Sequence, residues 1–424
     1  MMSVMKILSQ RTVSVIMAFA PFWIFMIFFK FGGGLHYTLL SPLGEKVMPL
    51  WIVGLLVGVS SAVQLLLDVP AGRILDRFGY RRFLKITTAT FLVAVACLLF
   101  GFDRHIYILS LAISTFGWLF FGPGVSAYIL SHAPKDIAGK FISLRDVSGS
   151  IGIVLSSSIL PFVLLLPPQG MGLILFCILS VALIMLFLSP KDTVSVHAEI
   201  KIPTHHHYIR RHSIGKLIKA ITKLNPASGM LLLTELSGAT FYGSIWFVVP
   251  LVIAHQADSG LLSIGLAIFD FSVVVLGFLL GNLADTSNKR MLVFFGLLTF
   301  SVSGMIIGFD FGWVFIIFGF LATTGDEMAG ISLWSWLHSL DKRHDEDGTV
   351  AGVINLFSDL GWAIGPFVAG ILYTIIGPSL TILVCAVPIF IVWIVYQFML
   401  RRYHTSTEQI LDIPKKPHKM RYKH

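Results

Sequence analysis

The sequence predicts an all-α membrane protein in which twelve transmembrane helices form two pseudo-symmetric lobes of six helices each. Three observations support this fold class. Hydrophobic residues make up 56% of the chain and charged residues only 12%, with a mean hydropathy of +0.85, whereas a soluble domain carries roughly 25% charged residues. The apolar residues are gathered into long runs, and the two halves of the chain share an internal repeat.

Each apolar run is long enough to cross a membrane as a helix. A crossing helix needs about 20 apolar residues, because every backbone amide must find its hydrogen-bond partner within the segment. The runs cover residues 13–34, 50–73, 83–101, 106–131, 141–166, 170–189, 229–253, 261–284, 291–309, 313–337, 350–376 and 379–400.

One long polar segment separates the first six spans from the last six. The predicted organisation is an N-terminal six-helix lobe at 1–189, a basic, His-rich linker at 190–228, a C-terminal six-helix lobe at 229–400 and a basic tail at 401–424. In the linker, His205, His206 and His207 have no cysteine or acidic partner at ligand spacing, so a solvated loop is expected there and no metal site.

The distribution of Lys and Arg predicts that both termini lie in the cytoplasm. In that orientation the outer loops hold only Lys46 and Arg104. The net charge of +9 is then explained by membrane topology, and nucleic-acid binding is not implied. We expect a multi-pass protein of the plasma or inner membrane whose basic tail contacts lipid headgroups.

An offset of 209 residues aligns the two halves of the chain. Parallel six-helix repeats of this kind are a standard architecture of secondary transporters, in which two halves surround a central site. Glycine, acidic and basic residues coincide under this offset, so that Gly72, Asp76 and Arg81 fall on Gly281, Asp285 and Arg290.

The segment after the second span carries a specific motif, Asp68-Val-Pro-Ala-Gly72-Arg-Ile-Leu-Asp76-Arg77-Phe-Gly79-Tyr-Arg81-Arg82. This motif resembles the signature loop of the major facilitator superfamily, and residues 281–290 resemble its weaker second copy. The resemblance extends to the span count, the linker and the repeat. It implies a transporter fold with a cytoplasmic gate that latches the lobes, formed by Asp68, Gly72, Asp76, Arg77, Gly79, Arg81, Arg82, Gly281, Asp285 and Arg290.

The chemistry of the motif suits a gate between helices. Gly72 has no side chain, so another helix can approach closely, and Gly79 permits a tight turn. Asp76 can accept hydrogen bonds at a helix N-terminus, where the helix dipole favours an anion. The arginines can pair with carboxylates across the loop, and the alternative is that they only anchor the topology.

The eleventh span contains Gly361-Trp-Ala-Ile-Gly365-Pro366, which predicts a bent helix packed closely on its neighbour. Exporters of the superfamily usually carry a similar Gly-Pro motif in the fifth span. Many proton-coupled members carry an arginine before a glycine run in the fourth. Both features are missing from this sequence, so proton coupling is not carried over from them.

Among the charged residues inside the predicted spans, six are candidate site residues. A charge at mid-bilayer costs at least ~2.5 to 3.5 kcal/mol, so each needs a partner, water or a function. In the superfamily the helices that carry these residues face a central cavity. We therefore expect substrate or proton binding by Lys30, Glu235, Asp270, Asp326, Glu327 and Asp359, the alternative being that each carboxylate only bridges two helices.

The repeat makes two of these expectations more specific. Glu235 aligns with Met26, one helical turn before Lys30, which predicts an ion pair between Lys30 and Glu235 across the lobe interface. Asp326 and Glu327 are adjacent and point about 100° apart. Only one of the two is therefore expected to face the cavity fully, and Asp326 is preferred.

Aromatic residues accompany the charges on the same helices, among them Trp23, Trp118, Tyr242 and Trp246. Such residues can stack on an organic cation, or they can simply pack against lipid and neighbouring helices.

The sequence has no P-loop, zinc-protease or serine-hydrolase motif, so neither enzymatic activity nor a cofactor is expected. Our first hypothesis is a monomeric, proton-coupled carrier, an antiporter for an organic cation or amphipathic drug-like molecule, with export slightly preferred. The alternatives are an importer of an anionic metabolite that uses Lys30 as the counter-charge, and a non-transporting membrane sensor or scaffold.

Overall fold

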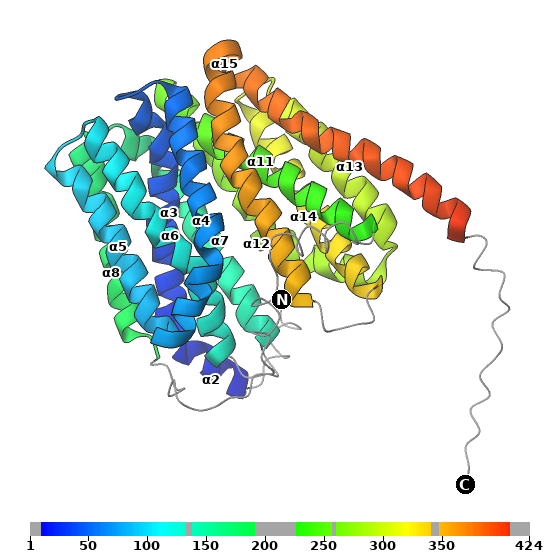
Figure 1. Cartoon of the computed structure of the whole chain (residues 1–424), viewed down its shortest axis with the longest axis horizontal. Coiled ribbons are helices and arrows are strands. Elements are labelled where there is room, and N and C mark those ends of the chain that lie inside the picture. Colours follow the sequence, from blue (N-terminus) through cyan, green and yellow to red (C-terminus); the bar gives the residue numbers. More distant parts are fainter. Residues whose placement is uncertain (1–9, 133–137, 191–225, 257–259, 341–346, 408–424) are drawn as a thin grey trace, which may run out of the picture.

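The computed structural model describes residues 10–132, 138–190, 226–256, 260–340 and 347–407, and within these ranges it contains helices and no strands (Figure 1). The helices in chain order are α2 (Gln10–Ala18), α3 (Ala20–Glu45), α4 (Leu50–Phe78), α5 (Tyr80–Phe100), α6 (Arg104–His132), α7 (Ala138–Leu164), α8 (Pro168–Leu188), α11 (Pro226–His255), α12 (Gly260–Thr286), α13 (Lys289–Ile307), α14 (Trp313–Leu340) and α15 (Asp347–Thr407).

Twelve membrane crossings result from eleven long apolar helices in the described part of the chain. The last helix, α15, contains the apolar stretch Leu356–Met399 of 44 residues. A straight helix of that length would measure roughly 66 Å, about twice the thickness of the hydrocarbon core. The chain instead folds back near Gly377, whose φ of 78° is left-handed, so α15 crosses twice (Figure 1). The predicted all-α fold of twelve crossings is confirmed.

The first span begins and ends later than the sequence predicted. The apolar run covers residues 13–34, but α3 begins at Ala20, with Pro21 in its first turn, and continues to Glu45. The glycines at the predicted end of the span lie inside the helix, where side chains of neighbouring helices pack against them. A Cβ added at Gly33 would lie 2.7 Å from the Trp118 ring, and one added at Gly32 would lie 2.8 Å from Leu179. The predicted boundary was therefore wrong, because these glycines allow neighbouring helices to pack against α3.

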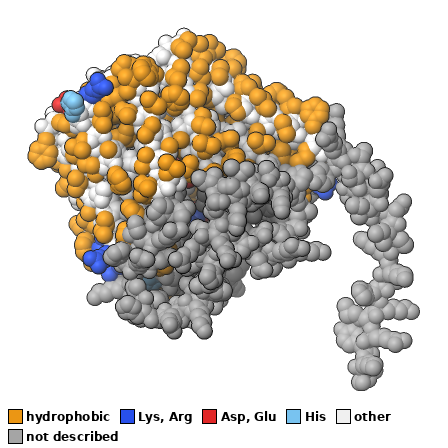
Figure 2. Space-filling view, viewed as in Figure 1, with side chains coloured by type: hydrophobic (Ala, Val, Ile, Leu, Met, Phe, Trp, Pro, Cys, Tyr) orange, Lys and Arg blue, Asp and Glu red, His pale blue; other side chains and the backbone are white. Residues whose placement is uncertain are grey.

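Each six-helix half has its own aromatic core. In the first half, Phe29 on α3 stacks on Phe121 of α6 with 4.1 Å between ring centroids. In the second half, Tyr242 on α11 stacks on Phe300 of α13 at 5.8 Å. The outer surface is apolar, and Figure 2 shows hydrophobic side chains prevailing over the part of the visible face that is not grey. This arrangement is typical of a helix bundle surrounded by lipid.

The two halves approach each other most closely through glycines on α4 and α15. A Cβ added at Gly54 would collide with the carbonyl oxygen of Pro366, and one added at Gly370 would lie 2.7 Å from the carbonyl oxygen of Leu50. Backbones therefore touch directly where α4 begins. We call this part of the bundle the closed end.

Polar groups add two further contacts between the halves at the closed end. The buried Ser41 hydroxyl on α3 donates a hydrogen bond of 2.7 Å to the carbonyl oxygen of Phe247 on α11. At the ends of the same two helices, the His255 imidazole lies 3.0 Å from the Glu45 carboxylate, and both side chains are partly exposed. The second contact is solvated, and exposed pairs of this kind contribute only about 0–1 kcal/mol.

We expect Gly54→Ala to open the closed end. The added methyl group would overpack the contact between α4 and α15, and overpacking costs about 1–3 kcal/mol, which is enough to shift the balance between closed and separated arrangements about fivefold or more. Spin labels are placed at positions 46 and 256 in a background without the native cysteines, and the distance between them is measured by double electron–electron resonance. Gly54→Ala should add a population at longer distance. Gly277→Ala is the matched control, because a Cβ there meets no atom within 4 Å. Identical distance distributions in the two variants would contradict this role of Gly54.

Candidate functional site

Two pockets lie between the two halves, and a third, within the second half, adjoins one of them. The central pocket has a volume of about 410 Å³ and is lined by Lys30, Tyr37, Trp118, Trp246, Asp270, Asp359 and Trp362, among others. The acidic pocket, of about 280 Å³, is lined by Glu235, Tyr242, Asp326, Glu327, Trp334 and Trp362, among others. The mixed-charge pocket, of about 410 Å³, is lined by Met26, Lys30, Ser126, Arg145, Asp146 and Asp270, among others.

The pockets share residues and extend away from the closed end. Lys30 and Asp270 line both the central and the mixed-charge pockets, and Trp362 lines both the central and the acidic pockets. Along α11, Glu235 precedes His255 of the closed end by twenty residues, which corresponds to about 30 Å of helix. We call these three adjoining pockets the cavity, and Glu235 in the acidic pocket lies far from the closed end along α11.

Lys30 is placed in the cavity but not in the predicted ion pair. Its ammonium lies 5.1 Å from the centroid of the Trp118 ring and 5.3 Å from that of Phe121. The carboxylate that attracts it is Asp270, from α12 of the other half. No ion pair joins Lys30 to Glu235, whose carboxylate belongs to the acidic pocket.

The prediction of this pair failed for a geometric reason. The repeat correctly placed Glu235 in the position equivalent to Met26, and Met26 lines the mixed-charge pocket while Glu235 lines the acidic one. Residues related by the repeat occupy equivalent pockets of the two halves, and this does not require them to face each other.

The acidic pocket gathers three carboxylates from two helices. Glu235 comes from α11, while Asp326 and Glu327 come from α14. Tyr242 lines the same pocket as these carboxylates. Both Asp326 and Glu327 line the pocket, and which of the two faces it more fully stays a prediction. Within the described ranges, none of the three forms an ion pair.

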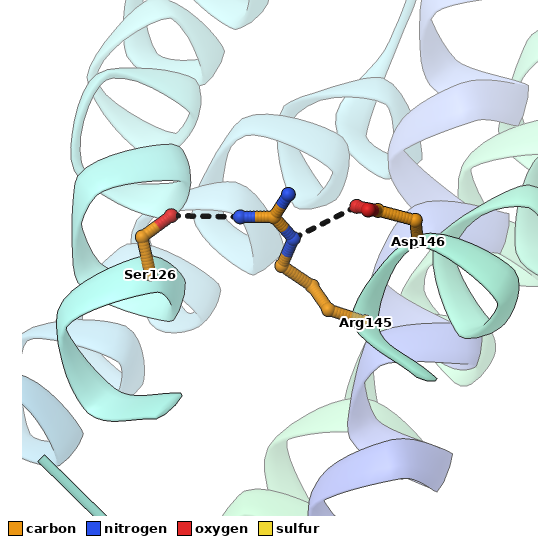
Figure 3. Close-up of polar contacts among 3 residues, drawn as sticks. All are labelled: Ser126, Arg145 and Asp146. Atoms are coloured by element: carbon orange, nitrogen blue, oxygen red, sulfur yellow. Dashed lines mark hydrogen bonds and ion pairs between the residues drawn. The ribbon is translucent and has the colours of Figure 1, made fainter. Parts of the chain in front are cut away.

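A partly exposed arginine that was not among the predicted site residues, Arg145, lies in the mixed-charge pocket. The Arg145 guanidinium on α7 donates one hydrogen bond of 2.8 Å to Asp146 and one of 3.1 Å to the Ser126 hydroxyl on α6 (Figure 3). The available signal was the adjacent pair of opposite charges inside the fifth predicted span.

The aromatic candidates divide into two groups. Trp118 and Trp246 line the central pocket, and Tyr242 lines the acidic one. Trp23 lines none of these three pockets, since it packs against Phe141 and donates its indole hydrogen to the carbonyl oxygen of Ile16.

Two aromatic residues of the central pocket were not among the site residues predicted from the sequence. Tyr37 and Trp362 face each other across the two halves with 6.0 Å between ring centroids, and both line the central pocket. Tyr37 lies beyond the predicted end of the first span, and Trp362 falls within the glycine motif of the eleventh.

The predicted gate residues are only partly described. The side chains of Asp68, Gly72, Asp76, Arg77 and Asp285 lie outside the described residues. Gly79 precedes α5 with a left-handed φ of 87°. Arg81 is buried and donates hydrogen bonds to the carbonyl oxygens of Leu186 and Phe187 at the end of α8, where the helix dipole favours a cation.

The remaining gate positions and the glycine motif lie at helix contacts or on the surface. Arg82 is exposed, a Cβ at Gly281 would meet open space, and the Arg290 guanidinium lies 5.5 Å from the centroid of the Trp336 ring. A Cβ at Gly361 would lie 2.6 Å from Ala239, and one at Gly365 would lie 2.5 Å from the carbonyl oxygen of Thr240. The segment of α15 before Pro366 therefore packs directly on α11.

Two six-helix halves with charged pockets at their interface are an architecture of secondary transporters. The sequence profile of the Major Facilitator Superfamily matches residues 12–366, and the chain belongs to this family of transporters. A similar solved structure is the crystal structure of the human organic anion transporter MFSD10 (TETRAN), with a TM-score of 0.63 and 14% sequence identity over 89% of this chain and 98% of that chain. At this identity the similarity shows the fold alone. No match is found among curated proteins.

The cavity predicts a specific pattern of chemical labelling. In a background without the native cysteines, Asp270→Cys should react with a charged, membrane-impermeant thiol reagent, because position 270 lines two water-accessible pockets. The matched control is Phe271→Cys, since Phe271 is 46% exposed on the apolar outer surface of the same helix. Equal reactivity at the two positions would show that α12 does not present Asp270 to the cavity.

Proposed function

We propose that this protein exchanges a small organic cation for protons by alternating access, with export as the preferred direction. The observation that carries the proposal is the acidic pocket, where three carboxylates from α11 and α14 meet without an ion-pair partner among the described residues. A cation that enters this pocket replaces lost hydration with carboxylate oxygens.

The walls of the acidic pocket also suit an organic cation rather than a bare ion. Tyr242, Trp334 and Trp362 line the pocket beside the carboxylates. The face of an aromatic ring attracts a cation when the charge lies within about 6 Å of the ring centroid. A pocket that combines carboxylates with aromatic rings favours a charged group attached to an apolar body.

Proton coupling follows from competition for the same carboxylates. Removal from water favours the neutral form of a carboxyl group, and a neighbouring carboxylate strengthens this effect. Glu235, Asp326 and Glu327 share both conditions, so protons and a cationic substrate would displace each other from them. Alternating loading of this kind is the basis of antiport.

The orientation follows from the charge distribution and the open direction of the cavity. We place the closed end on the outside, because the loops there carry few basic residues, and the cavity then faces the cytoplasm. Both termini are cytoplasmic in this orientation. The motif from Asp68 to Arg82 closes the cavity on the inner side of the plasma or inner membrane, and the monomer is the transporting unit.

A second candidate function rests on Lys30. This residue offers an ammonium group to the cavity, which supports uptake of an anionic metabolite. The similar structure is described as an organic anion transporter, but fold similarity does not decide the charge of the substrate. A non-transporting sensor or scaffold on the same fold is the third possibility, and it would tolerate Asp76→Asn and show no counterflow.

We expect Glu235→Gln to weaken the binding of a lipophilic cation such as tetraphenylphosphonium at least about tenfold, since removing one member of a desolvated charge pair costs 2 kcal/mol or more. The measurement is counterflow in proteoliposomes together with calorimetry on the purified protein. Asp310→Asn removes an exposed carboxylate outside the cavity and should leave both readouts unchanged. Equal behaviour of the two variants would argue against the acidic pocket as the cation site.

Lys30→Met distinguishes the two transport hypotheses. If the substrate is a simple anion, this variant alone should abolish uptake, and Glu235→Gln should have little effect. If the substrate is a cation, counterflow should depend on Glu235 and should survive the loss of Lys30.

A further inference from the structure

Charges of both signs face the cavity without a direct partner. Among the described residues, the Lys30 ammonium takes part in no hydrogen bond and no ion pair within 4 Å, and its contacts are with the rings of Trp118 and Phe121. Glu235 and Glu327 likewise form neither a hydrogen bond nor an ion pair with any described residue. By contrast, Arg145 and Asp146 already pair with each other.

These unpartnered charges come from opposite halves of the bundle. Lys30 lies on α3 of the first half, whereas Glu235 on α11 and Glu327 on α14 belong to the second. A cation could compensate the carboxylates but would leave Lys30 without a directly paired counter-charge, since Asp270 attracts it from beyond 4 Å. An anion could compensate Lys30 but would leave the acidic pocket uncompensated. A ligand that fills the cavity removes water from these partly exposed charges, and charges without water are costly unless they are paired, so neither ligand satisfies the whole cavity.

The central pocket joins the two kinds of charge. Lys30 lies in its wall, and Trp362 lies in the wall that it shares with the acidic pocket. Between them the central pocket is lined by the rings of Tyr37, Trp118 and Trp246, which provide an apolar surface, and by the Asp359 carboxylate. Asp270 also lines this pocket and attracts Lys30, yet the two groups form no ion pair within 4 Å. A ligand carboxylate can therefore still approach the ammonium.

We propose that the substrate is an organic zwitterion whose two charges are separated by an apolar spacer. Its carboxylate binds Lys30, its ammonium binds Glu235 and Glu327, and its spacer crosses the central pocket along Trp118 and Trp362. This inference rests on the proposed function, because it assigns the cationic part of the substrate to the acidic pocket. It adds a second point of attachment on the other half, so that one ligand links α3 to α11 and α14.

The test uses ligands that differ in one charge at a time. The probes are ω-amino acids from 4-aminobutanoate to 8-aminooctanoate, each with its primary amide, which keeps only the ammonium, and its N-acetyl derivative, which keeps only the carboxylate. Affinities are measured by calorimetry on the full-length protein. For the best spacer length, the zwitterion should bind about tenfold or more tightly than either derivative, because each charged contact contributes at least about that factor.

Variants then assign each charge to its residue. Lys30→Met should remove the advantage of the zwitterion over its amide while leaving amide binding intact, which also shows that the variant is folded. Lys30→Arg should retain most of the advantage. Glu235→Gln should weaken the zwitterion and the amide by the same factor.

The inference is overturned if, at every spacer length, the amide binds as tightly as the zwitterion, or if Lys30→Met weakens both equally. If Glu235→Gln still weakens binding of the amide in that case, the proposal of a cation carrier is retained. If no probe binds, the zwitterion is rejected, and counterflow of tetraphenylphosphonium then decides separately whether the cation carrier is also wrong.

Discussion

The structure depends on one constraint, which is that a charged side chain placed between hydrocarbon-facing helices must find water or an opposite charge. The cavity charges Lys30, Glu235, Asp270, Asp326 and Glu327 all turn away from the apolar outer surface and toward the interface of the two halves. Helices that carry such charges cannot be packed together by apolar contacts alone. A hydrated cavity between the halves follows from this requirement, and the bundle is organised around it.

The contacts within a half and the contacts between halves differ in physical character. Within each half, large rings stack and interdigitate, as Phe29 does with Phe121 and Tyr242 with Phe300. Between the halves at the closed end, the contacts include glycine against backbone, one serine hydrogen bond and one partly exposed pair of side chains. Buried apolar side chains of both halves also belong to one continuous cluster. The polar contacts between the halves are individually weak, so close backbone packing and apolar burial are what hold the closed end together.

The distribution of charge breaks the symmetry of the repeat. The mixed-charge pocket holds Lys30, the paired Arg145 and Asp146, and Asp270 from α12, whereas the acidic pocket of the second half holds three carboxylates. The backbone is thus repeated while the chemistry is not. A ligand in the cavity experiences a basic group on one side and an acidic cluster on the other, and this polarity is the basis of the proposed recognition of a dipolar substrate.

Hydropathy, the repeat and the motif from Asp68 to Arg82 were sufficient to predict twelve crossings and the family, because these properties are local or recur at fixed spacing along the chain. The identity of the charged residues within the spans was also evident from the sequence. Only the tertiary structure decided that α3 continues through Gly32, Gly33 and Gly34, since that depends on the rings and side chains that pack there. It likewise decided that Asp270 attracts Lys30 and that Asp326 and Glu327 share one pocket. Partners of this kind depend on the rotation of each helix about its axis and on how two halves far apart in sequence pack together, and neither is encoded in a local pattern.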